Sequence, residues 1–155
     1  MRSKFDEQLL QLNHEMIEMG ALCEEVIALS SQALTEGDTA RASKVAPLDC
    51  EIDHNEREIE NLCLKLLLRQ QPVARDLRQI SAALKMITDM ERIGDQAEDI
   101  AEIVAFLDGR QAENDALLKE MAKAVIQMVT DCVDAYVNCD LRSVGYKHLG
   151  AHVSD

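Results

Sequence analysis

Apolar residues recur along this chain in alternating steps of four and three, the heptad pattern of long helices that pack side by side. Four such seams can be followed, and they run from Phe5 to Ala33, from Val45 to Leu66, from Ile80 to Val104 and from Leu118 to Cys139. No stretch shows the strict alternation of apolar and polar residues that is typical of a β-strand. The pattern therefore predicts four helices, at about 3–36, 39–70, 73–107 and 113–139.

Turn-forming residues separate the predicted helices. Gly37-Asp38 ends the first, with Asp38 expected as the next N-cap, and Gln71-Pro72 and Asp108-Gly109 mark the other boundaries. Pro47 lies near the start of the second helix, where it predicts a kink or a delayed first turn. Because the links are short, neighbouring helices should be antiparallel. We therefore predict an all-α fold, an antiparallel bundle of long helices.

The composition agrees with helices and narrows the classes of function. Only 3% of the 155 residues are aromatic, and 29 acidic residues against 16 basic ones give a formal net charge of -13. Such an excess repels phosphate backbones and anionic headgroups, so we expect no nucleic-acid partner. No apolar run approaches the length of a membrane span, so we expect no direct membrane insertion. The five cysteines lack a Cys-x-x-Cys spacing and indicate free thiols in a reducing cytoplasm.

Two columns of carboxylates are the most informative polar feature. Each acid follows a seam position by one residue, with Asp49, Asp53, Glu56 and Glu60 on the second helix, and Glu91, Asp95, Glu98 and Glu102 on the third. Like charges at these spacings destabilise a helix unless something neutralises them. Aligned carboxylates supply the oxygen ligands that magnesium, manganese, iron or zinc accept. The alternative is a solvated acidic face, paired with the basic residues Arg57, Lys85 and Arg92.

Other candidate sites are less complete. Glu51-x-x-His54 matches an element of di-iron carboxylate bundles, but such a site needs a second copy and the sequence has none. His148 and His152 are one helical turn apart in a poorly patterned segment. Nothing resembles a phosphate-binding glycine loop or a nucleophile with a paired base, so we predict that the protein is not an enzyme. Gly94 lies in mid-helix, where its missing side chain would let a neighbouring helix or an ion come close.

A faint internal repeat links the first and the last predicted helix. A shift of 102 residues, from 18 to 120, places Glu18-Met19-Gly20 on Glu120-Met121-Ala122. Ordinary similarity between heptads could produce part of this match. The repeat predicts that the fourth helix begins a second copy of a three-helix unit.

Three stretches of the sequence carry recognisable motifs: LDCEIDHNE at 48–56, PVARDLRQI at 72–80 and LKMITDMERIGDQAEDIAE at 84–102. These stretches resemble the PhoU family of phosphate-uptake regulators, and the Glu-Arg-Ile-Gly-Asp element is the most specific part. The resemblance covers about residues 5–140 and implies two tandem three-helix bundles that bind iron or zinc clusters. Magnesium and manganese are the alternative ions. The resemblance implies four metal ligands and three weaker candidates: Asp49, Asp53, Glu91 and Asp95, then Glu56, Glu98 and Asp99.

The chain follows only part of the domain division that this resemblance implies. We expect a complete three-helix repeat at 1–109, the first helix of a second repeat at 110–140 and an irregular tail at 141–155. The second Glu-Arg-Ile-Gly-Asp helix is absent, so a second metal site should be missing.

The resemblance further implies a cytoplasmic adaptor that works by protein contact. It would restrain phosphate uptake and the phosphate-starvation response through the ATPase subunit of the phosphate ABC transporter and a phosphate-sensing histidine kinase. The alternative is a metal-independent acidic helical module that docks a basic partner. The fourth seam also needs a cover, either from the first bundle or from another chain, and we predict a homodimer.

Overall fold

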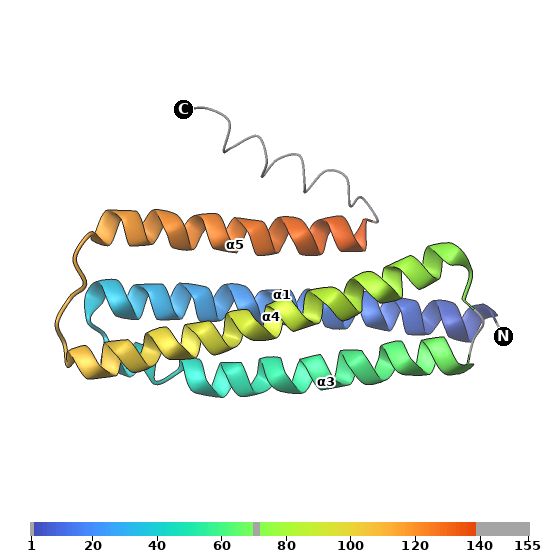
Figure 1. Ribbon diagram of the computed structural model, residues 1–155, viewed down its shortest axis with the longest axis horizontal. Coiled ribbons are helices and arrows are strands. Elements are labelled where there is room, and N and C mark those ends of the chain that lie inside the picture. Colours follow the sequence, from blue (N-terminus) through green and yellow to red (C-terminus); the bar gives the residue numbers. More distant parts are fainter. Residues whose placement is uncertain (1, 70–71, 139–155) are drawn as a thin grey trace, which may run out of the picture.

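The computed structural model describes residues 2–69 and 72–138, and within these ranges the chain is helical apart from short links. The helices are α1 (Arg2–Glu36), α2 (Thr39–Ala42), α3 (Val45–Arg69), α4 (Ala74–Leu107) and α5 (Asp115–Val137). The four long helices run side by side along the long axis of the molecule, and each runs opposite to the long helix before it (Figure 1). The prediction of an all-α antiparallel bundle is confirmed.

The second predicted helix is divided in two. Asp38 caps the short helix α2 by accepting a hydrogen bond from the backbone N–H of Arg41 at 3.0 Å, as expected. A turn at Ser43 and Lys44 then separates α2 from α3. Pro47 is the third residue of α3, where its missing N–H interrupts no helical hydrogen bond. The break at Ser43 and Lys44, just before Pro47, agrees with the predicted delay of the first turn.

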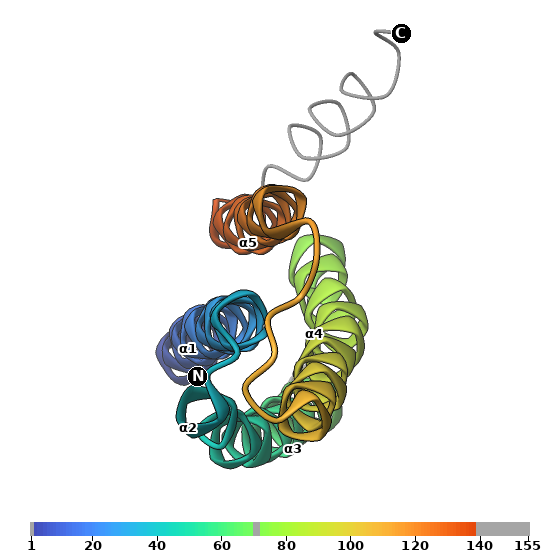
Figure 2. The ribbon, with the colours of Figure 1, turned by 90° about the vertical axis from the view of Figure 1, so that its left-hand side faces the viewer.

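The core lies between α1, α3 and α4, which surround it in an end-on view (Figure 2). Every seam position of α4 is buried: Ile80, Ala83, Ile87, Met90, Gly94, Ala97, Ala101 and Val104. On α1, six seam side chains are fully buried: Leu12, Met16, Met19, Cys23, Val26 and Ala33. Burying each large apolar side chain contributes about 1.5–3 kcal/mol, so these three seams are the main source of stability.

The seam predicted for the fourth long helix is mostly exposed, and of its described residues only Ala135 is buried. Of its side chains, Met121 is 56% exposed and Met128 is 46% exposed. α5 instead buries Val129, Val133 and Tyr136, and it packs mainly against α1 (Figure 2). The helix carries two apolar faces, and the heptad pattern alone could not show which of them faces its neighbour.

The exposed face of α5, which we call the α5 stripe, consists of Leu117, Met121, Val125, Met128 and Cys132. Three of its members follow α1 seam residues by 102 positions: Met121 follows Met19, Val125 follows Cys23 and Met128 follows Val26. Those α1 residues are fully buried in the core shared with α3 and α4. Within the described part of the chain, no helix covers the α5 stripe in the same way.

α5 lies against α1 at a small residue. A Cβ added at Gly20 would lie 2.7 Å from Cγ2 of Val133, so glycine sets the close approach of the two helices. The Thr130 hydroxyl also donates a hydrogen bond to the Glu24 carboxylate at 2.5 Å.

No helix among the described residues is both long enough and apolar enough to cross a membrane. The expectations for the tail at 141–155, including His148 and His152, fall outside the described residues.

Candidate metal centre

The two carboxylate columns face each other across the α3–α4 interface. Because the helices are antiparallel, residues early in the α3 column oppose residues late in the α4 column. Asp49 therefore lies beside Glu98, with which it shares a side-chain hydrogen bond, and not beside Glu91. The chain reversal between α3 and α4 thus turns two separate sequence patterns into one acidic interface.

Six predicted site residues contribute to two overlapping clusters or to their surroundings. One carboxylate oxygen from each of Asp49, Asp53 and Asp95 lies within 4.8 Å of the others. A second group with the same spacing contains Asp53, Glu56 and Glu91. Asp53 belongs to both groups. Glu98 contacts the first group through its hydrogen bond to Asp49.

Burial makes the first cluster unusual among acidic groups. Asp49 is only 4% exposed, and the Oδ1 atoms of Asp49 and Asp53 are buried without a hydrogen-bond partner. Burial is the main cause that raises the pKa of Asp49 from 3.8 to about 7, followed by the hydrogen bond with Glu98 and the charges of Asp53 and Asp95. At neutral pH the Asp49 carboxyl of the metal-free cluster is therefore partly protonated. A bound cation would instead supply the positive charge that the cluster needs.

The second cluster is similarly perturbed. A hydrogen bond with Asp95 is the first cause that raises the pKa of Glu91 to about 7, with burial and neighbouring charges adding to it. Burial and the charge of Asp53 raise the pKa of Glu56, although Arg57 opposes this shift. The pKa values of three predicted ligands, Asp49, Glu56 and Glu91, are thus higher than those of solvated carboxylates.

Basic side chains do not neutralise the clusters by ion pairing in the described part of the chain. Arg92, which could have paired with the α4 column, lies 3.9 Å from Asp89 instead. The ion pairs of residues 2–69 and 72–138 otherwise involve Arg41 with Glu36 and Asp38, and Lys119 with Asp115. Of the basic residues weighed from the sequence, Arg57 lowers the raised pKa of Glu56, and Arg92 pairs with Asp89.

Gly94 makes room for the first cluster. A Cβ added at this position would overlap Oδ1 of Asp49 and would lie 3.3 Å from Cδ1 of Ile52. The expectation that Gly94 admits a close neighbour agrees with this geometry, and the neighbour is the Asp49 carboxylate. The cost of about 1 kcal/mol for glycine in mid-helix is thus tied to the placement of a predicted ligand.

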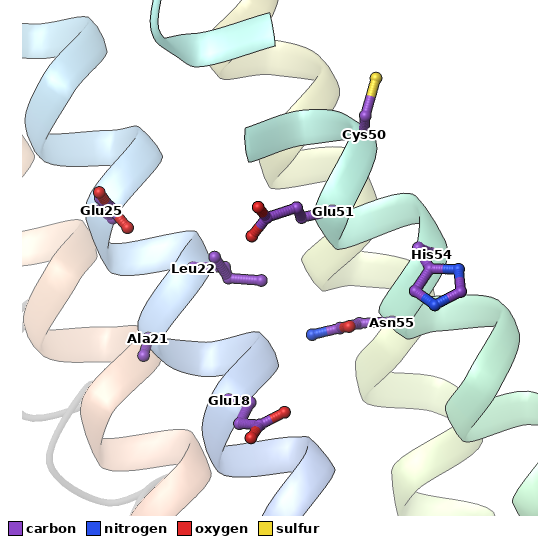
Figure 3. Close-up of a pocket in the computed structure, with 8 residues that line it drawn as sticks. All are labelled: Glu18, Ala21, Leu22, Glu25, Cys50, Glu51, His54 and Asn55. Carbon is purple, nitrogen blue, oxygen red and sulfur yellow. The ribbon is translucent and has the colours of Figure 1, made fainter. Parts of the chain in front are cut away.

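The remaining acids of the motif lie outside the clusters. Asp99 belongs to neither three-residue group and is exposed, as are Glu60 and Glu102 at the far ends of their columns. Glu51 and His54 lie in a groove between α3 and α1 (Figure 3), together with Cys50. Cys50 is therefore not part of the carboxylate clusters. The sequence pattern did not predict this groove, because nothing in the spacing of Glu18, Leu22 and Glu25 distinguishes them from other residues of α1.

Two overlapping groups of carboxylates with unpartnered buried oxygens provide the donor set that hard and borderline cations prefer. The protein is therefore an all-α bundle of long helices, in which the acidic columns of two antiparallel helices face each other and form a candidate metal centre. The PhoU domain family matches residues 16–104, more than half of the chain. The protein belongs to the PhoU family.

Similarity to individual proteins agrees with this assignment. The chain is 38% identical over 144 residues to a phosphate-specific transport system accessory protein PhoU homolog of Clostridium acetobutylicum, covering 90% of this chain and 65% of that protein. It is 44% identical over 102 residues to the homolog of Synechocystis sp., covering 66% of this chain and 46% of the relative. The crystal structure of PhoU from Pseudomonas aeruginosa superposes with a TM-score of 0.81 at 31% identity, covering 88% of this chain and 66% of that one.

The matched proteins are longer than this chain, which spans about half to two thirds of the length of these relatives. Their family is one of accessory proteins and not of enzymes, in agreement with the prediction from the sequence.

Proposed function

We propose that this protein is a metal-binding regulatory adaptor of phosphate transport that acts by protein contact. The observation that carries the proposal is the pair of overlapping carboxylate clusters at the α3–α4 interface of a PhoU-family bundle. The relatives' description as accessory proteins of phosphate-specific transport supports the biological setting.

In this proposal Asp49, Asp53, Glu91 and Asp95 hold the ion or ions, with Glu56 at the edge of the second cluster. Glu98 orients Asp49 through their hydrogen bond, and Asp99 stays a weaker candidate. Iron or zinc is the preferred ion, with magnesium or manganese as alternatives. A bound cation would supply positive charge between α3 and α4, and so would fix their relative position in the adaptor.

The proposed partners are the ATPase subunit of the phosphate ABC transporter and the phosphate-sensing histidine kinase. Negative regulation of uptake and of the starvation response would follow from these contacts in the cytoplasm. The exposed α5 stripe supports a homodimer as the working form, since paired chains would remove it from water.

The decisive experiment is metal analysis of protein purified without chelators. We expect bound iron, zinc or manganese in the wild type, and its loss in the double variant Asp53→Asn with Asp95→Asn. Glu60→Gln with Glu102→Gln is the matched control, because it removes two exposed carboxylates from the same columns outside the clusters. Wild-type protein that takes up no ion would refute the metal site, and partner binding that persists in chelator would favour the metal-independent module.

A further inference from the structure

A second acidic feature lies on the opposite side of α3 from the carboxylate clusters. A cavity of about 580 Å³ opens between α1 and α3, and Leu22, Glu51 and Asn55 point into it from the two helices (Figure 3). Its α1 wall contains Glu18, Ala21 and Glu25. The floor is therefore apolar and its charged edges are acidic.

This cavity continues along α1. A second cavity of about 570 Å³ shares Glu18 with the first, and all the residues that line it lie on α1. It extends to Leu10, an exposed leucine with 68% of its surface in water. We call the two together the α1–α3 groove. Between Leu10 and Glu25 the groove follows about four turns of helix, or roughly 22 Å.

The charges of the groove are one-sided. Its lining contains four glutamates, namely Glu15, Glu18, Glu25 and Glu51. It also contains His14 and His54, and neither lysine nor arginine. None of the ion pairs in the described part of the chain involves these four. The Oε2 atom of Glu15 is buried without a hydrogen-bond partner, although its other oxygen accepts a bond from Gln11 at 3.3 Å. The negative charge of the groove is therefore uncompensated by any ion pair of the described residues, and a cationic partner would neutralise it.

We propose that the α1–α3 groove binds a basic amphipathic helix of a partner protein, with leucine-like residues on the apolar floor and lysine or arginine against the glutamates. This interaction is separate from the metal-binding function and does not depend on it.

The backbone chemistry favours a helix over an extended peptide. The walls of the groove are helices, whose backbone groups are already paired, so they offer no free edge to an extended strand. A helix satisfies its own backbone and needs only side-chain contacts. The same groove of a second copy is disfavoured as the occupant, because it would bring glutamates against glutamates.

The test uses the full chain with chelator present and a fluorescent, amidated peptide of about four helical turns. The peptide has leucines in alternating steps of four and three, flanked by lysines. We expect saturable binding by fluorescence anisotropy, with a gain of peptide helicity by circular dichroism. Glu18→Gln with Glu51→Gln should weaken binding about tenfold, since two close charge pairs are lost.

The matched control is Glu113→Gln with Glu120→Gln, which removes two exposed charges outside the groove and should change affinity less than about twofold. Leu10→Ser should weaken binding about fivefold without destabilising the fold, because the side chain is 68% exposed.

Three outcomes would overturn the proposal. Equal weakening by both charge pairs would mean that only the overall negative charge attracts the peptide. Equal binding of a peptide with serines in place of leucines would remove the role of the apolar floor. A dimer in light scattering that Glu18→Gln with Glu51→Gln dissociates would make a second copy of the chain the occupant.

Discussion

Replacing Asp49 by asparagine should stabilise the metal-free protein at neutral and alkaline pH. The buried carboxyl group has a pKa of about 7 in the folded chain against 3.8 as an ordinary aspartate. Between these pH values the unfolded chain releases the proton and the folded chain keeps it. The free energy of unfolding of the wild type therefore falls as the pH rises from about 4 to about 7, and then stays low.

The size of the effect follows from the shift in pKa. Three pKa units correspond to about 4 kcal/mol at pH 8, which is an upper limit for the gain in Asp49→Asn. The charges of Asp53, Asp95 and Glu98 contribute to the shift and respond to the loss of the Asp49 carboxyl, so we expect a gain nearer to about 2 kcal/mol. At pH 4 the folded carboxyl is protonated and the unfolded one is partly protonated, so the advantage of the variant should fall below about 1 kcal/mol.

Urea unfolding followed by far-UV circular dichroism, in chelator at pH 4 and at pH 8, measures this difference. Glu60→Gln serves as the control, because an exposed carboxylate of the same column should change stability by less than about 0.5 kcal/mol. Addition of zinc or manganese should reverse the order at pH 8, since only the wild type would gain binding energy. An Asp49→Asn protein that is less stable than the metal-free wild type at pH 8 would refute the reasoning.

Three further predictions concern the clusters and α5. Gly94→Ala should lower both the melting temperature and the retention of metal, because the added Cβ would overlap the Asp49 carboxylate. This loss should outweigh the better helix propensity of alanine, and metal retention equal to that of the wild type would contradict the prediction. Zinc affinity measured by calorimetry should fall about tenfold to a hundredfold per pH unit below pH 7, because Asp49 and Glu91 must each release a proton before they bind the ion. A constant affinity between pH 7.5 and pH 6 would argue against ligation by both residues. Met128→Lys should convert a dimer into a monomer in light scattering with little loss of stability, because the residue is 46% exposed; a monomeric wild type would remove the dimer from the proposal.

The bundle could be predicted from the sequence wherever a helix carries one apolar face. α4 is the clearest case, since all eight positions of its seam are buried as the periodicity indicates. The break between α2 and α3 was harder to predict, because Ser43 and Lys44 are not strong turn residues and only Pro47 pointed to irregularity. For α5, which carries apolar residues on two faces, periodicity could not decide which face α1 would cover.

For the candidate site, too, one part could be predicted from the sequence and another part could not. The acids could be chosen from their spacing along each helix, because that spacing fixes which side chains share a face. Their partners across the interface could not, because the pairing of Asp49 with Glu98 depends on the offset between α3 and α4. That offset arises from packing along the whole interface, including the contact between Gly94 and Asp49. The α1–α3 groove likewise depends on how α1 and α3 pack against each other.

The α5 stripe also affects how the chain would fare inside a cell. Met121, Val125 and Met128 form a continuous apolar surface on a folded helix, and quality-control chaperones and proteases bind such surfaces. A chain whose stripe is covered by a partner escapes that surveillance, whereas an uncovered chain is held or degraded. The abundance of this protein would then follow the supply of whatever covers α5, so that unassembled copies do not accumulate.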